Sequence, residues 1–185
     1  MRAVIDTSSL LALVRYYLPF EKEFSLTKLI QGKIKNGELI LLDKVALESV
    51  RVSRGVIAEK LPVIKDKKHQ FVTDFLLPEA GFIRDLENKL SYPVQKRKLG
   101  ETEFENRKRE FLESADAKLI LFCLADKRSP SLDELILVTE ESRASNDGKL
   151  FKKLPVLCEL LDIGHCNLTS LLIEHFKVRM SEFLL

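Results

Sequence analysis

The sequence predicts an α/β fold with a mainly parallel central sheet flanked by helices, and three observations support this prediction. Three short apolar runs, at residues 3–5, 38–42 and 135–139, have the length and composition of buried strands, and residues 164–168 are interpreted as a last short strand. Helical patterns separate these runs, and this alternation is typical of parallel α/β proteins. The 185 residues are enough for one domain with its own hydrophobic core.

The first predicted strand, residues 3–5, is a short apolar run that stops at Asp6. A polar turn at residues 7–9 then leads into an apolar helix. This order places Asp6 at the carboxyl end of a strand, and ligands bind at that edge in open α/β sheets. Taken alone, Asp6 is equally suited to cap the helix that follows it.

The second predicted strand, residues 38–42, follows a helical pattern at 20–34 that ends at Asn36-Gly37. Asp43 is a suitable N-cap for the helix after this strand. Glu48 lies on that helix at the edge of an apolar face, from which a carboxylate can point back over the sheet edge. In isolation, such a glutamate is more often solvated.

Residues 60–112 are more charged and helical, with proline and glycine at intervals. No boundary is strong enough to define a separate domain, so we interpret residues 1–185 as a single domain with a helical insertion at about 60–112. Two basic clusters are either solvated faces or a groove that positions phosphates. They consist of Lys96, Arg97 and Lys98 in the insertion, and of Lys152 and Lys153 nearer the predicted sheet edge.

The segment after the insertion predicts a helix that is apolar on nearly all sides and therefore buried. Ser114 is expected to cap this helix, and Asp116 lies in its first turn, where the helix dipole favours an ionised carboxylate.

The third predicted strand, residues 135–139, ends in Glu140-Glu141. Later in the chain, Asn146-Asp147-Gly148 predicts a turn, Pro155 a helix start and Thr169 a helix cap.

The bulk composition excludes several classes of function. Thirty basic and 28 acidic residues leave a formal net charge of +2, so any affinity for nucleic acid must come from local patches. No apolar run is long enough to predict a membrane span, and the first residues do not resemble a signal peptide. Three cysteines without paired spacing favour a reducing cytoplasm over a disulfide framework.

Four acidic residues occupy matching positions in this predicted topology: Asp6, Glu48, Asp116 and either Glu141 or Glu140. If the strands are parallel, all four converge on one edge of the sheet. Carboxylates brought this close raise one another's pKa values, and a divalent cation relieves their repulsion. Such a cation activates water for hydrolysis of a phosphodiester. The pattern therefore predicts a Mg²⁺ or Mn²⁺ site.

Several stretches of this chain resemble the successive acidic motifs of PIN-domain nucleases. They are residues 4–8, Glu48 in its helix, residues 115–117 and residues 138–141. The later stretches at 154–159 and 167–168 resemble a DUF4411-type branch of that superfamily. The resemblance spans nearly the whole chain and is weakest in the helical middle.

This resemblance implies a PIN-like fold and a Mg²⁺- or Mn²⁺-dependent ribonuclease, often the toxin of a VapC-like toxin–antitoxin pair. Asp6, Glu48 and Asp116 would be metal-binding, catalytic carboxylates. The fourth acid of the family is an aspartate two residues after a threonine, and here Thr139-Glu140-Glu141 places Glu141 there. Ser8 resembles the small hydroxyl residue that supports the first aspartate, and Glu140 is expected beside the site. The implied partners are RNA, an antitoxin protein and a second copy of the chain.

Two other interpretations remain open at this point. The first is a catalytically silent PIN-like module that binds RNA or a protein, which the glutamate at the fourth position favours. The second is a flap-type DNA nuclease, although the chain is short for that role and lacks the additional acids of those enzymes. A zinc site at Cys158, His165 and Cys166 does not fit the spacing of structural zinc sites.

Overall fold

A computed structural model describes residues 1–128, 133–143 and 148–185. In these residues, five parallel strands form one sheet in the order β3-β2-β1-β4-β5. The strands are β1 (Arg2–Ile5), β2 (Leu39–Leu42), β3 (Gln70–Phe71), β4 (Leu135–Val138) and β5 (His165–Cys166). The α/β class and the parallel sheet predicted from the sequence are confirmed, and the arrangement is consistent with a PIN-like fold.

Helices connect and cover the strands. The α-helices are α1 (Thr7–Ala12), α2 (Ser25–Lys35), α3 (Asp43–Arg51), α4 (Val56–Lys60), α5 (Ala80–Asn88), α6 (Pro93–Lys96), α7 (Glu101–Leu112), α8 (Ala115–Arg128), α9 (Leu154–Leu160), α10 (Leu168–Ser170) and α11 (Met180–Phe183). Short π-helices lie at Leu13–Tyr17 and Leu171–His175. Short 3₁₀ helices lie at Leu18–Phe20, Val52–Gly55, Pro62–Lys65 and Lys67–His69.

The central strands are buried on both faces, which explains their nearly continuous apolar sequences. Their register aligns the carboxyl ends of β1 and β4, because Ile5 pairs with Val138. Val138 pairs in turn with Cys166 on β5. The residues that directly follow β1 and β4, Asp6 and Thr139, therefore emerge side by side at the same edge of the sheet.

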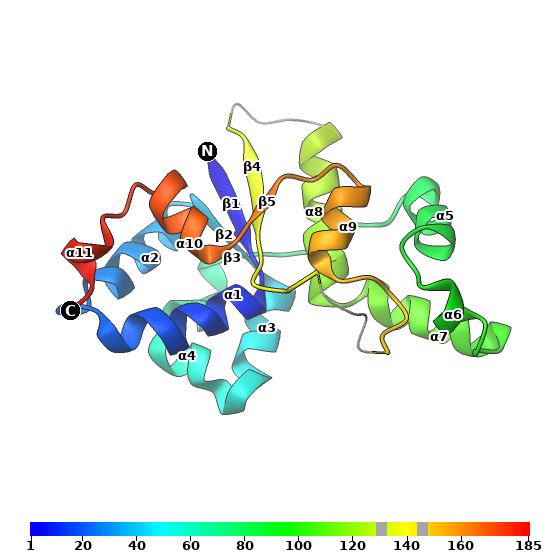
Figure 1. Ribbon diagram of the computed structural model, residues 1–185, viewed down its shortest axis with the longest axis horizontal. Coiled ribbons are helices and arrows are strands. Elements are labelled where there is room, and N and C mark those ends of the chain that lie inside the picture. The colour runs from blue at the N-terminus through cyan, green and yellow to red at the C-terminus, as the bar shows by residue number, and fades with distance from the viewer. Residues whose placement is uncertain (129–132, 144–147) are drawn as a thin grey trace.

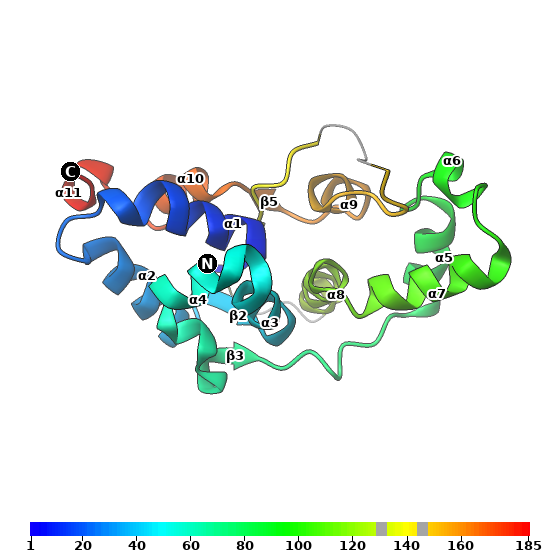
Figure 2. The same ribbon diagram turned by 90° about the horizontal axis from the view of Figure 1, so that it is seen from below.

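The helices lie on both sides of the sheet and extend well beyond it. In Figures 1 and 2, α2 and α10 lie on one side of the strands, and α8 and α9 lie on the other. The buried residues of α8 include the whole run from Ala117 to Cys123, and the helix packs on β2 and β4, so its predicted burial is confirmed. Helices α5, α6 and α7 lie beyond α8 and α9, at the end of the molecule away from the sheet.

Two details differ from the expectations. Strand β3 lies inside the segment expected to be a helical insertion, where two residues, Gln70 and Phe71, extend the sheet beside β2. The helix expected at 20–34 begins only at Ser25, because Glu23 and Phe24 have left-handed backbones, with φ of 48° and 58°. A two-residue strand has no periodicity, so the sequence carries no local signal for β3.

Two expected helix caps are also wrong. Asp43 is the first residue of α3 rather than its cap, and its Oδ1 accepts hydrogen bonds from Lys44 N at 2.7 Å and Thr73 Oγ1 at 2.7 Å. At α10 the cap is Asn167, whose Oδ1 accepts from Ser170 N, while Thr169 bonds to the Tyr17 hydroxyl. Ser114 does cap α8, because its Oγ accepts from Ala117 N at 3.2 Å.

Two further expectations concern the membrane and a turn. Within the described ranges, no helix combines the length and the apolar character that crossing a membrane requires. Of the turn expected at Asn146-Asp147-Gly148, the first two residues lie outside the described residues.

Candidate functional site

Asp6 is held at the edge of the sheet by hydrogen bonds to both oxygens of its carboxylate. Oδ1 accepts from Ser9 N at 2.7 Å, which caps α1. Oδ2 accepts from Ser8 Oγ at 2.8 Å and from Thr139 Oγ1 at 2.7 Å. Burial raises the pKa of Asp6, and these hydrogen bonds oppose that rise. Asp6 is thus a helix cap and also a fixed acid at the sheet edge.

The turn after β4 is tied to Asp6 through the same two hydroxyl groups. Glu140 N donates to Ser8 Oγ at 3.0 Å, and Glu141 N donates to Thr139 Oγ1 at 3.1 Å. Each hydroxyl therefore accepts one hydrogen bond and donates its own proton to Asp6. Ser8 and Thr139 occupy the supporting positions that the resemblance implies, and they determine where Glu141 leaves the sheet.

The two neighbouring glutamates after β4 point to different places. Glu140 Oε1 accepts from Leu168 N at the start of α10, at 2.7 Å. Glu141 Oε2 accepts from Leu154 N at the start of α9, at 2.9 Å, and Lys149 Nζ lies 3.7 Å from Glu141 Oε1. Glu141 is therefore the acid that faces the other carboxylates, at the position expected for the fourth acid.

Glu48 and Asp116 approach the same place from two helices. Thr7 Oγ1 donates to Glu48 Oε2 at 2.6 Å, which draws this glutamate of α3 toward the start of α1. Asp116, in the first turn of α8, has no side-chain hydrogen bond or ion pair with any residue that the structure describes. Burial, followed by the charges of Glu141, Glu48 and Asp6, raises the pKa of Asp116 to about 7.

One cavity of about 240 Å³ joins these groups. Its lining residues are Asp6, Thr7, Ser8, Leu11, Glu48, Val52, Asp116, Glu141 and Lys149. We call it the acidic cavity. In the described parts of the chain, no three acidic, histidine or cysteine side chains are close enough to hold one metal ion directly. The site is therefore an open group of carboxylates rather than a closed cage of ligands.

Lys149 is the residue of this site that the sequence analysis missed. Its side chain lines the acidic cavity and a larger neighbouring cavity. The larger cavity brings together Lys98, Lys152 and Lys153 of the two basic clusters, but not Lys96 or Arg97. Lys96 Nζ instead donates to Glu87 O at 2.7 Å, and Arg97 is exposed. Lys149 could have been identified from the sequence, because it lies in the segment that follows β4, three residues before Lys152.

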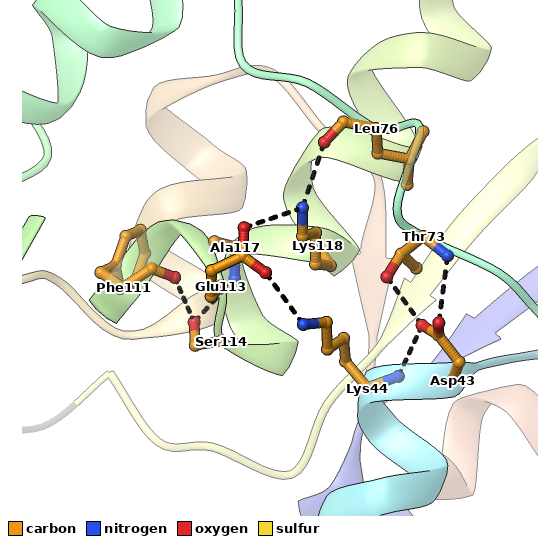
Figure 3. Close-up of polar contacts among 9 residues, drawn as sticks. All are labelled: Asp43, Lys44, Thr73, Leu76, Phe111, Glu113, Ser114, Ala117 and Lys118. Carbon is orange, nitrogen blue, oxygen red and sulfur yellow. Dashed lines mark hydrogen bonds and ion pairs between the residues drawn. The ribbon is translucent and has the colours of Figure 1, made fainter. Parts of the chain in front are cut away.

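A polar network behind the site ties α3 to α8, the helices that carry Glu48 and Asp116 (Figure 3). Glu113, just before α8, accepts from Lys44 Nζ of α3 at 2.9 Å. Its other oxygen lies 3.5 Å from the buried Lys118 Nζ, which also donates to Leu76 O at 3.2 Å. The network positions α8 relative to α3 and so helps to set the separation of the two acids.

Replacing Glu113 by Ala should destabilise the protein by about 1–2 kcal/mol, because the nearly buried Lys118 ammonium loses its carboxylate partner. Chemical denaturation followed by circular dichroism measures this change. The matched control is Glu110→Ala, since Glu110 is exposed and pairs only at 3.8 Å with the exposed Arg107. Equal stability losses in the two variants would show that the network does not hold the helices together.

The fold and this site define an α/β protein with an acidic cavity at the carboxyl edge of a parallel sheet. Comparisons of the chain with protein-family models, curated proteins and solved structures found no match. The function is therefore inferred from the geometry and chemistry of the site.

Proposed function

We propose that the chain is a Mg²⁺- or Mn²⁺-dependent endoribonuclease of the PIN-domain type. One observation carries this proposal: four carboxylates from four separate elements line one small cavity, and one of them, Asp116, faces the others without a partner among the described residues. Uncompensated negative charge of this kind is costly in a fold, and active sites are where such arrangements persist.

The donor set of the acidic cavity suits a hard divalent cation. Mg²⁺ prefers oxygen ligands, keeps several of its waters and is usually bound through only one or two carboxylates. Asp116, which has no partner among the described residues, and Asp6 would hold such a hydrated ion, with Glu48 and Glu141 reaching it through water. A bound cation of this type lowers the pKa of a water molecule and stabilises charge on a phosphate.

The surrounding residues orient the acids before any ligand arrives. Ser8 and Thr139 hold Asp6, Thr7 holds Glu48, and the start of α9 holds Glu141. Preorganised charges of this kind need little rearrangement when a substrate binds. Lys149, on the rim between the two cavities, is placed to contact a phosphate of the substrate.

The test is cleavage of a circular single-stranded RNA by the purified full chain. A circle has no ends, so its conversion to a linear product reports endonucleolytic cleavage. We expect cleavage with Mn²⁺ or Mg²⁺, loss of cleavage with EDTA, and recovery when Mn²⁺ is added in excess. Cleavage that is indifferent to EDTA, or no cleavage with either ion, would contradict the proposal.

A second candidate is a catalytically silent module that binds RNA or a protein. The position of Lys149 favours it, because an ammonium 3.7 Å from Glu141 already offsets part of the negative charge. Calorimetric titration with Mn²⁺ separates the two candidates. The nuclease should bind Mn²⁺ in a manner that depends on Asp6, whereas a silent module should show no carboxylate-dependent binding.

We further propose a cytoplasmic setting and protein partners. The three cysteines are free thiols in the structure, which fits a reducing compartment. Tyr16, Phe20 and Phe24, between α1 and α2, are large apolar side chains that are each more than half exposed. Exposed aromatic groups of this kind suit a protein interface, so an antitoxin or a second copy of the chain would bind there.

A further inference from the structure

The larger cavity, which we call the basic cavity, directly adjoins the acidic cavity. It has a volume of about 560 Å³, within the range of pockets that hold small organic ligands. Asp116 and Lys149 line both cavities, so a ligand that fills the basic cavity reaches the acids. Its lining comes from the end of α6 and the residues after it, from α7 and the start of α8, and from the segment 148–153.

The rim of the basic cavity is strongly cationic. Five basic side chains line it against two acidic ones, Glu110 and Asp116. Among the basic groups, Lys98 is exposed, and its ammonium has no hydrogen bond or ion pair with any described residue. Lys152 belongs to the segment 148–153, and its Nζ lies 5.9 Å from the centre of the Tyr92 ring. Cations without carboxylate partners are available to bind phosphate.

The floor of the basic cavity is apolar and aromatic. Phe111 and Phe151 line it, with ring centroids 4.4 Å apart and planes tilted by 33°. Leu99 and Leu150 complete this surface. Phe151 is buried, whereas Phe111 is only partly buried, so Phe111 presents the available ring. An aromatic floor under a cationic rim is the combination that binds a base and its phosphates.

We propose that the basic cavity is a nucleotide subsite for a single-stranded RNA substrate. The base lies against Phe111, the adjoining phosphates lie between Lys98 and Lys152, and the chain continues past Lys149 to the acidic cavity. This inference rests on the proposed function. It adds which part of the RNA substrate the basic cavity binds. A paired base is stacked within its duplex, so this subsite selects unpaired nucleotides.

The first test measures binding of a fluorescein-labelled single-stranded RNA by anisotropy in EDTA, so that no cleavage occurs. The Lys98→Ala/Lys152→Ala variant should bind about 10- to 100-fold more weakly, and the slope of log affinity against log salt should fall by about 1.4, which is 0.7 for each lost phosphate contact. The matched control is Lys67→Ala/Lys68→Ala, which removes the same charge from exposed residues outside the cavity. Equal losses in both variants would overturn the subsite.

The second test examines the base. Phe111→Leu keeps an apolar side chain but removes the ring, and it should weaken binding about 5- to 100-fold, the range expected for one base–aromatic stack. An RNA with abasic positions should bind the parent and Phe111→Leu equally. The control is Phe75→Leu, an exposed phenylalanine outside the cavity. Unchanged affinity of folded Phe111→Leu for the unmodified RNA would refute the stacking.

The outcomes of these tests distinguish an error in the subsite from an error in the proposed function. If the lysine and Phe111 variants bind normally while cleavage still requires Asp6, the subsite is wrong and the nuclease proposal stands. If both variants lose affinity but the parent never cleaves, the subsite is correct and the chain binds single strands without cutting them. Since the lysine variant removes no fully buried side chain, it remains informative even if Phe111→Leu is unstable.

Discussion

Replacing Asp6 by Asn should reduce Mn²⁺-dependent RNA cleavage on the order of 1,000-fold, because a catalytic metal supplies several kcal/mol and each 1.36 kcal/mol is a factor of ten. The structure adds a second reason. The hydroxyls of Ser8 and Thr139 each accept a backbone N–H and donate to Asp6 Oδ2. An asparagine would set its NH₂ against either these two hydroxyls or Ser9 N–H, so at least one hydrogen bond that fixes residue 6 would be lost.

The measurement is the single-turnover rate of cleavage at saturating protein, with thermal melts to show that the variant is folded. Asp162→Asn is the matched control. Asp162 is a fully exposed carboxylate in a left-handed backbone conformation, which asparagine also tolerates. If folded Asp6→Asn cleaves as fast as the control, Asp6 has no role in catalysis.

Asp116→Asn should also abolish cleavage, but it should make the fold more stable above neutral pH. The pKa of Asp116 is raised to about 7 by burial and by the three other acids, whereas an aspartate in an unfolded chain titrates near 3.9. The folded state therefore binds the proton more tightly, and stability falls as pH rises from about 4 to 7. Removing this charge should add about 1–3 kcal/mol at pH 8, after allowance for screening at the open cavity.

The gain should shrink as the pH is lowered from 8 to 5, because the parent Asp116 is then protonated and uncharged. Urea denaturation at both pH values measures it, and Asp162→Asn should show no comparable pH-dependent gain. Mn²⁺ should stabilise the parent at pH 8 more than it stabilises Asp116→Asn, since the variant lacks one of the carboxylates that attract the ion. A variant that is less stable than the parent at pH 8 would show that the acids do not repel one another as inferred.

The positions of Asp6 and of the Glu140-Glu141 pair could be predicted from local sequence. A buried strand that ends in a polar residue and leads into a helix places that residue at the carboxyl edge of a parallel sheet. The choice between Glu140 and Glu141 could not be made locally with the same certainty. It depends on two backbone N–H groups far along the chain, Leu168 N and Leu154 N, which draw the two side chains apart.

Other features had a weak local signal or none. Glu48 has the sequence position of an ordinary surface acid, and only the hydroxyl of Thr7 turns it into the site. The contact between Lys44 and Glu113 joins α3 to the start of α8, which is distant in sequence, and β3 is too short to show a strand pattern. Contacts between distant segments decide these features, whereas sequence periodicity reports only neighbours along one element.

Asp6 illustrates what each level of description determined. The sequence by itself determined the α/β class, the strand ends and the candidate acids, because apolar runs and capping residues act over a few positions. Only the tertiary structure decided that the acids share one cavity, that Lys149 lies among them and that a basic, aromatic cavity adjoins them. Those properties depend on strand register and on the docking of α7 and α8, and both are set by the packing of the whole core.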